Sequence, residues 1–462
     1  AELQSQVAWL QSNGETQLDG KTAFNLYSTL GFPLEITRDI LEEDGLTVDE
    51  EGFYAAMEAH RLASGKGQAF TKMGSNDAEF YAGVLSDLQS QGKLPAEGVL
   101  YDPYSSFSAE AQLAAILRDG ELVTSAEAGD EVELILTKSP FYLESGGQVG
   151  DSGTVISAEQ PEWEVEVSSA RQPVTGLIVL RGIVRHGTPR ADDKALARLD
   201  ETARRATMRN HTGTHLLHAA LRNVLGEKVH QSGSAVDPER LRFDFNFPRA
   251  LRSDELLQIE ALVNRYIASE YPVHKQVKTL EEAKAEGAIA LFGEKYGSEV
   301  RTIEIADQRG RVSYELCGGT HLDNTAEIGS FYITSESSVA AGIRRIEAVT
   351  GERAYAWARE RLNLLNETAA FLETSPFELR QKAELLENKI KELDKELEHL
   401  RVVAVDPDHR PARARRRRLL LETHDSAALE LGDAEALGLL GLLQQHARAA
   451  SLRAEAGEEP AR

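Results

Sequence analysis

Residues 211–215 read His-Thr-Gly-Thr-His, and residues 317–321 read Cys-Gly-Gly-Thr-His. Side chains four positions apart on a helix share one face, so His211 and His215 can direct two imidazoles at one point. Cys317 is the single cysteine of the chain, and His321 follows it after two flexible glycines. Three imidazoles and one thiolate suit Zn²⁺. The pattern predicts a zinc site that brings two distant segments together; two unrelated histidine pairs are the alternative.

Composition limits the classes to which the 462-residue chain can belong. Its length predicts about three domains. A single cysteine forms no internal disulfide, which is typical of a reducing, cytoplasmic location. The first residues have no secretion-signal pattern, and no apolar run approaches the ~18 residues of a membrane span. The net charge of −24 disfavours indiscriminate nucleic-acid binding, but a local basic patch can still attract phosphates.

Changes in periodicity predict an α+β multidomain fold. Residues 131–136 and 163–167 alternate apolar and polar side chains between glycine turns, as antiparallel strands do. The predicted parts are a helical region at 1–105, a small antiparallel β-barrel-like unit at 106–190, a two-layer α+β domain with both metal segments at 191–355, a long helix at 356–400, and a basic, weakly patterned tail at 401–462.

The glycine-rich segment 145–153 interrupts the strand pattern. Four glycines in nine residues leave backbone amides unshielded, so Gly146, Gly147 and Gln148 are candidate substrate contacts. A tight hairpin explains the same glycines.

A coiled-coil-like seam follows the α+β region. Residues 375–378 read Ser-Pro-Phe-Glu, a capping box with proline at the first helical position. Apolar residues then recur at alternating spacings of four and three over 379–400. This helix could pair with a second copy or dock on its own chain. The arginine run at 410–418 could contact RNA, or could belong to a charged, disordered tail.

The predicted zinc site has two interpretations that must be considered, a zinc protease and a structural zinc. A zinc protease of the His-Glu pattern needs glutamate directly after the first histidine, where this chain has Thr212. That difference disfavours peptide hydrolysis. A structural zinc has four protein ligands and a closed shell, whereas a catalytic zinc keeps one position open. The sequence alone leaves this choice undecided.

Several motifs in series resemble the alanyl-tRNA synthetase family. Residues 209–215, 287–297, 315–321 and 344–351 resemble its editing domain, and the resemblance extends in order from about residue 15 to 400. It implies a zinc-dependent hydrolase that cleaves serine or glycine from tRNA(Ala). A pocket for alanine discriminates against such neighbours by only ~1–3 kcal/mol, so a second site is needed. The alternative is a zinc-stabilised tRNA-binding module without activity. The family's aminoacylation core is expected to lie before residue 1.

The resemblance also suggests roles for individual residues. Gln231 matches a position implicated in editing, and its amide could orient water or the ester carbonyl. Thr212 and Thr214 could hydrogen-bond the serine hydroxyl, or could simply bond back to their own helix. His218 is expected to be a packed helix residue. The expected tRNA(Ala) contacts are Arg209, Arg344 and Arg345, with Gly146, Gly147 and Gln148.

Overall fold

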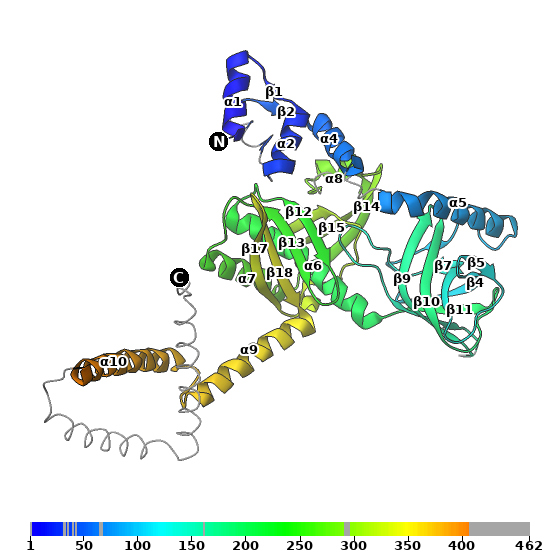
Figure 1. Ribbon diagram of the computed structural model, residues 1–462. Coiled ribbons are helices and arrows are strands. Elements are labelled where there is room, and N and C mark those ends of the chain that lie inside the picture. Colours follow the sequence, from blue (N-terminus) through cyan, green and yellow to red (C-terminus); the bar gives the residue numbers. More distant parts are fainter. Residues whose placement is uncertain are drawn as a thin grey trace. The chain divides into compact units, whose positions relative to one another are not determined.

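The computed structural model divides into two compact units, residues 1–361 and 362–462. Figure 1 shows the elements of each unit. The predicted tail after residue 405 and part of the 287–297 motif lie outside the described residues. The described residues are 2–30, 34, 37–38, 41, 44–63, 68–159, 162–290 and 296–405. No helix in these ranges is long and apolar enough to cross a membrane.

The first part of the chain is mainly helical. It contains α1 (Glu2–Asn13), α2 (Gly20–Leu30), α4 (Glu50–Ala63) and α5 (Gln68–Ser90), with a two-residue parallel pair of β1 (Gln17–Leu18) and β2 (Thr47–Val48). Helices α2 and α4 meet at Gly20, where an added Cβ would lie 2.2 Å from the Phe53 nitrogen. Only glycine permits this close approach.

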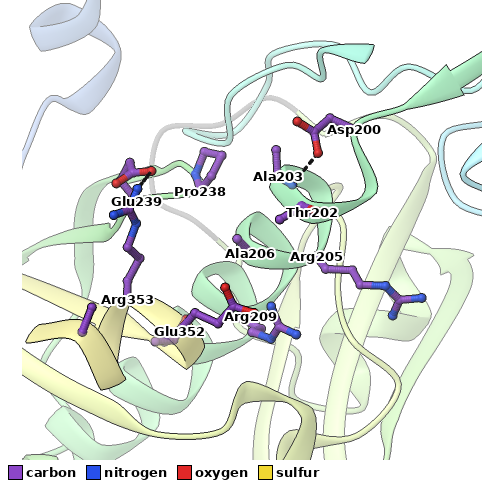
Figure 2. Close-up of a pocket in the computed structure, with 12 residues that line it drawn as sticks. Asp200, Thr202, Ala203, Arg205, Ala206, Arg209, Pro238, Glu239, Glu352 and Arg353 are labelled. Atoms are coloured by element: carbon purple, nitrogen blue, oxygen red, sulfur yellow. Dashed lines mark hydrogen bonds and ion pairs between the residues drawn. The ribbon is translucent and has the colours of Figure 1, made fainter. Parts of the chain in front are cut away.

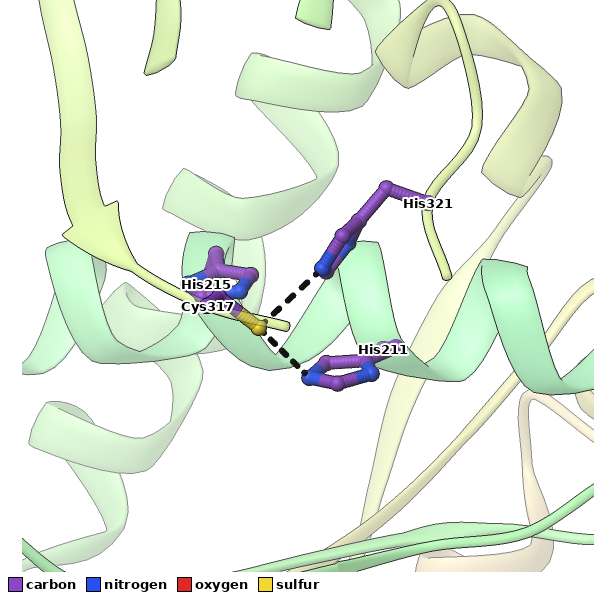
Figure 3. A group of neighbouring side chains, drawn as sticks. All are labelled: His211, His215, Cys317 and His321. Atoms are coloured by element: carbon purple, nitrogen blue, oxygen red, sulfur yellow. Dashed lines mark hydrogen bonds between the residues drawn. The ribbon is translucent and has the colours of Figure 1, made fainter. Parts of the chain in front are cut away.

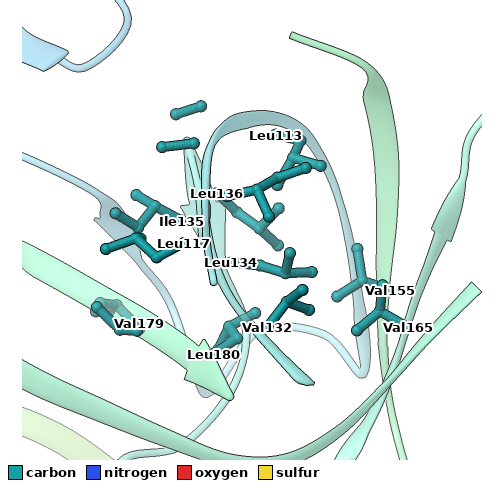
Figure 4. Packing of buried hydrophobic residues seen from close by; sticks show 14 of the residues in the cluster. Leu113, Leu117, Val132, Leu134, Ile135, Leu136, Val155, Val165, Val179 and Leu180 are labelled. Carbon is teal, nitrogen blue, oxygen red and sulfur yellow. The ribbon is translucent and has the colours of Figure 1, made fainter. Parts of the chain in front are cut away.

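The predicted barrel-like unit is a closed, six-stranded antiparallel barrel. Strand β11 pairs with both β8 and β4, which leaves no free edge between them. The strand order is β4 (Ser108–Arg118), β6 (Glu131–Leu136), β10 (Leu177–His186), β9 (Glu164–Val174), β8 (Gly153–Ser157) and β11 (Lys194–Leu199), with β5 (Glu121–Val123) added to β4. Alternating residues of these strands, including Leu134, Val155 and Val165, fill the interior (Figure 4). Short strands β3 (Leu100–Tyr101) and β7 (Lys138–Ser139) pair beside it.

The next part combines helices and strands, as the sequence predicts, and its strands form two antiparallel sheets. One sheet has the order β12 (Gln231–Val236), β13 (Leu241–Asn246), β18 (Ile343–Thr350), β17 (Phe331–Ala340); the other has β14 (Val273–Thr279), β15 (Glu299–Asp307), β16 (Gly310–Leu316). The helices are α6 (Glu201–Leu225), α7 (Ser253–Ala268) and the short α8 (Leu280–Ala285). Alternate residues Leu241, Phe243 and Phe245 of β13 are fully buried in a core shared with α6 and α7. This core fixes α6 relative to the strands.

Two helices replace the single long helix expected at 356–400. Helix α9 (Gly351–Phe371) ends before Glu373, which has a positive φ of 51°, and α10 (Leu379–Val405) begins after Pro376. A left-handed residue ends the first helix, and proline cannot continue it. The Ser375 hydroxyl donates to Glu378 Oε2 at 3.0 Å, but the second helix starts only at Leu379. The seam residues Ile390, Leu393 and Leu397 are exposed.

Candidate metal centre

Helix α6 carries the first two predicted ligands. Its N-terminus is capped by Asp200, whose carboxylate accepts from the Ala203 nitrogen at 3.0 Å. Gly213 lets the helix approach the sheet closely, because an added Cβ would lie 3.3 Å from Thr350 and 3.5 Å from Leu241. His211 and His215, two positions on either side of Gly213, lie on a different face of α6 and are both buried, with parallel rings whose centroids are 5.6 Å apart.

The loop after β16 carries the other two ligands, and its carbonyl groups are held from outside. Arg301 donates to the Cys317 carbonyl at 3.1 Å and to the Gly319 carbonyl at 2.6 Å, while the Tyr104 hydroxyl donates to the Gly318 carbonyl at 2.6 Å. The Gly319 backbone lies against the His211 ring, where an added Cβ would be 2.0 Å from Cε1. The turn therefore needs glycine at position 319.

The four predicted ligands converge (Figure 3). Cys317 Sγ lies 3.3 Å from His211 Nε2 and 3.3 Å from His321 Nε2, and the ligand atoms of all four residues lie within 4.8 Å of one another. A tetrahedral Zn²⁺ with ordinary bond lengths separates sulfur and nitrogen ligands by about 3.5 Å. The two sulfur–nitrogen distances of 3.3 Å are therefore close to the spacing that this ion requires.

The Nδ1 atom of each of the three histidines also lies beside a polar side chain. The Nδ1 atom of His211 lies 2.7 Å from Gln148 Oε1, that of His215 lies 2.8 Å from Glu315 Oε2, and that of His321 lies 3.3 Å from Thr212 Oγ1. In a neutral imidazole, an acceptor at Nδ1 favours the tautomer in which the proton is on Nδ1 and Nε2 has a free lone pair. The nitrogens that face the thiol are then the ones available to a metal.

Burial and charge give a further test of metal binding. Among the described residues, none hydrogen-bonds to His215 Nε2, although this atom is buried. Such an orphaned polar atom is costly unless it binds something. Burial opposes ionisation of Cys317, but His211 and His321 outweigh it and hold the thiol pKa well below its usual range. A thiolate beside an unpaired nitrogen is the donor set that Zn²⁺ prefers, so these residues fit the ion.

Glu315 is the functional candidate that sequence analysis missed. Its two oxygens lie 2.8 Å from His215 Nδ1 and 3.1 Å from His218 Nδ1, and it accepts from Ser313 Oγ at 2.8 Å. Burial would raise its pKa, but the two histidines reverse the shift and hold the pKa well below the usual range. Burial lowers the pKa of His215, yet Glu315 more than compensates and raises it to about 10. A metal must therefore displace a proton from His215.

His218 is a packed helix residue, as expected. Its ring lies against Phe243, with centroids 5.4 Å apart, and it is 1% exposed. Two features of the sequence point to Glu315: it opens the 315–321 motif, and it lies two residues before Cys317 at the end of β16.

The glycine-rich segment forms a tight turn that docks on β12. Gly146 and Gly147 have positive φ values of 57° and 80°, and Gly147 packs against Ser234, where a Cβ would lie 2.4 Å from the carbonyl oxygen. Gln148 pairs with Val236 and is fully buried. Besides its contact with His211, its Oε1 accepts from the Thr320 nitrogen at 2.9 Å. The segment therefore connects the barrel to both halves of the cluster.

The predicted catalytic residues form hydrogen bonds within the protein. Gln231 opens β12, and its amide donates to Ser234 Oγ at 3.1 Å. The Thr214 hydroxyl donates to the Asn210 carbonyl at 2.9 Å, which is the back-bonding alternative. The Thr212 oxygen, fully buried beside His321, also accepts from the Leu322 nitrogen at 3.2 Å. Their roles in catalysis stay predictions.

The predicted tRNA-binding arginines have acceptors within the protein. Arg345 donates twice to Asp244 at 2.7 Å, and Arg344 donates to Glu336 at 2.6 Å. Arg209 donates to a carbonyl, that of Glu327, at 3.0 Å. Carboxylates thus neutralise two of these three charges locally.

Comparison with known proteins first gives the class. A family model of class II tRNA synthetases (A) matches residues 2–203, and a model of the threonyl and alanyl tRNA synthetase second additional domain matches residues 300–347, which include Cys317 and His321. The chain is thus similar to class II tRNA synthetases over these two ranges. The expectation that the core lies wholly outside the chain is corrected to this extent, because the class II model matches residues within it.

Individual relatives identify the family within this class. The chain is similar to alanine–tRNA ligases of Thermoanaerobacter pseudethanolicus (43% identity over 400 residues), Thermus thermophilus (44% over 390) and Chloroflexus aurantiacus (40% over 409). These matches cover 87%, 83% and 86% of the chain, but only 43%, 42% and 44% of the relatives. The chain belongs to the alanyl-tRNA synthetase family and spans less than half the length of these relatives.

Proposed function

We propose that this chain is the editing hydrolase portion of an alanine–tRNA ligase. Its substrates would be tRNA(Ala) carrying serine or glycine, and the bond cleaved is the ester between the amino acid and the terminal ribose. The observation that carries the proposal is the cluster of His211, His215, Cys317 and His321, whose inward nitrogens and thiolate fit one Zn²⁺. Zn²⁺ would supply a Lewis acid near the ester.

The surrounding side chains have defined tasks in this proposal. Gln148, Glu315 and Thr212 hold the Nδ1 atoms of three ligands, so the ligand lone pairs keep their directions when a substrate enters. Gln231 would orient the ester or an attacking water, as its amide can donate and accept but cannot act as a base. Thr212 and Thr214 remain candidate contacts of the serine hydroxyl.

A deacylation assay tests the proposal directly. We expect the chain to release serine and glycine from tRNA(Ala) faster than alanine, and a chelator to stop this release. Cys317→Ala should abolish hydrolysis and lower bound zinc, because one ligand is lost. Replacement of the exposed His274 by alanine is the matched control and should retain both. Full turnover by Cys317→Ala would refute the proposal.

A zinc-stabilised tRNA-binding module is the second candidate. The burial of three ligands and the presence of four protein donors favour it, because a closed shell is typical of structural zinc. Such a module would bind tRNA(Ala) with a steep salt dependence, yet the ester would survive incubation. The same assay thus separates the two functions.

We also propose that the chain self-associates through residues 379–400. Its proposed location is the cytoplasm. The exposed apolar seam of α10 supports pairing with a second copy, because burial of such side chains is favourable. We expect sedimentation velocity to show concentration-dependent dimers. Leu393→Asp should abolish them, whereas Lys395→Asp, outside the seam, should not. Dimers that persist in Leu393→Asp would contradict this assignment.

A further inference from the structure

A cavity of about 220 Å³ adjoins the metal cluster on the side of the barrel loop 103–107. His321 and Thr320 form part of its wall, and Tyr104, Phe107, Arg205 and Arg301 line it as well. Because His321 is a ligand candidate, a molecule in this cavity lies directly beside the cluster. Cavities that adjoin such a group are the natural positions for a substrate.

Two aromatic rings of the barrel loop are each covered by a guanidinium group. Arg301 lies over the Tyr104 ring at 4.3 Å from its centroid, and Arg205 lies over the Phe107 ring at 4.9 Å. Tyr104 is 49% exposed, so part of its surface is open to solvent. Aromatic rings and arginine planes are the surfaces on which unpaired RNA bases stack.

The charges of the residues that line this cavity also favour the binding of RNA. The basic residues that line the cavity are Arg204, Arg205, Lys275 and Arg301, and the acidic ones are Asp323 and Glu327. Arg204 is neutralised by a buried ion pair with Asp151. Among the described ion pairs, Arg301 has no acidic partner, since it donates to the Cys317 and Gly319 carbonyls. The pairs of Arg205 with Glu201 and of Lys275 with Asp323 are exposed on at least one side and therefore weak.

A second cavity, of about 500 Å³, lies beside the first turns of α6 and lacks this excess of positive charge (Figure 2). Arg205, Arg209 and Arg353 line it together with three acidic residues, Asp200, Glu239 and Glu352. Arg353 is also paired with Glu239. An RNA backbone would meet as many carboxylates as guanidinium groups there.

We propose that the single-stranded 3′ end of an RNA binds along loop 103–107, with its terminal nucleoside in the cavity beside His321 and the preceding bases against the Tyr104–Arg301 and Phe107–Arg205 pairs. This inference rests on the proposed function, because it names the part of the substrate that reaches the cluster. It assigns RNA contact to residues other than Arg344, Arg345 and Gln148, which are paired or buried.

The binding test uses unacylated RNA, so that it does not depend on hydrolysis. The probes are one RNA hairpin with a single-stranded 3′ overhang and the same hairpin without it. The intact chain should bind the first more tightly. Tyr104→Leu and Phe107→Leu, which remove a ring but keep apolar volume, should each reduce this preference about five- to hundred-fold. Arg205→Gln should lower the salt slope of log K by about 0.7, the value for one phosphate contact.

Matched controls separate RNA contact from simple disruption of the fold. Arg181→Gln removes another exposed, ion-paired arginine from the barrel and should bind both hairpins as the intact chain does. Tyr104→Phe removes only the hydroxyl that bonds Gly318 and should keep the preference for the overhang. Zinc content should equal that of the intact chain in Phe107→Leu and Arg205→Gln.

Two results would overturn the inference: equal affinity of the intact chain for both hairpins, or an undiminished overhang preference in Tyr104→Leu and Phe107→Leu. A chain that prefers the overhang but leaves seryl-tRNA intact would contradict the proposed function while supporting this inference. The failures of the two proposals are therefore distinguishable.

Discussion

Two adjacent glycines in the loop that carries Cys317 and His321 differ in the space available for a side chain. An added Cβ at Gly319 would lie 2.0 Å from His211 Cε1, whereas one at Gly318 would have no atom within 4 Å. We expect Gly319→Ala to lose bound zinc and hydrolysis, because the His211 ring must leave its position. Gly318→Ala is the matched control and should keep its zinc. Metal content by mass spectrometry of the native protein would measure both; zinc retained by Gly319→Ala would contradict the geometry.

Glu315 is a positioning residue for His215. Glu315→Gln keeps the shape of the side chain but removes the charge next to His215 and His218. Loss of such a partner weakens zinc binding by about 10–100-fold. Competition with a chromogenic chelator measures the affinity. Glu304→Gln, which breaks a more exposed pair with Arg311, should leave the affinity unchanged. Equal zinc affinity in Glu315→Gln and the unaltered chain would show that the carboxylate has no such role.

Predictions for individual residues include both the most accurate and the least accurate ones made from the sequence. The four residues predicted as metal ligands lie together, because their chemistry is visible in residue type and spacing. Glu315 was missed, and Gln148 was predicted to contact substrate but lies fully buried against His211. Glutamate and glutamine have many uses, so only the distance to a ligand reveals their task.

At the scale of one element, the start of α7 depends on Glu255. Its carboxylate accepts two bonds from Arg249, at 2.7 and 2.8 Å, and one from the Arg252 nitrogen at 2.8 Å. The bonds from Arg249, followed by that from the Arg252 backbone, lower the pKa of Glu255 from 4.5 to about 2. A lowered carboxyl pKa stabilises the folded state above the unfolded pKa, and this stabilisation disappears as the pH falls.

Glu255→Gln should therefore be less stable than the unaltered chain at neutral pH, by about 1–2 kcal/mol for a lost helix cap. The difference should shrink as the pH falls from 4.5 towards 2, since Glu255 becomes protonated in that range. Urea unfolding at a series of pH values measures this. A stability difference that is independent of pH would show that the charge of Glu255 is not responsible.

Elements were predicted well where their periodicity is local. The alternating segments 131–136 and 163–167 lie in β6 and at the start of β9, because a period-two pattern buries one face of a strand. The assignment of 356–400 to one long helix was wrong, because α9 ends at Phe371 and α10 begins only at Leu379, just after the capping-box sequence at 375–378.

At the scale of the whole unit 1–361, a buried ion pair ties α6 to the segment that leads into the barrel. Arg204 donates to Asp151 Oδ1 at 2.8 Å and to the Pro103 carbonyl at 2.8 Å, with both charged side chains less than a tenth exposed. Asp151→Asn would leave the guanidinium charge buried without its partner. We expect a loss of about 3–5 kcal/mol in the free energy of unfolding.

Glu201→Gln provides the contrast on the same helix. It breaks the exposed pair with Arg205 and should cost less than about 1 kcal/mol. Urea denaturation followed by circular dichroism measures both variants. Similar stability of the two would show that the Arg204–Asp151 pair does not join α6 to this segment.

The sequence alone determined the strand and helix types, the donor chemistry of the cluster and the resemblance to the family, because each of these depends on residue identity and short spacing. The folded chain, in contrast, sets which buried groups contact the predicted ligands, which arginines are neutralised, and which cavity adjoins His321. These depend on contacts between residues far apart in the chain: Gln148 meets His211, and Tyr104 meets Gly318. Burial and charge pairing arise from such contacts, and local patterns do not encode them.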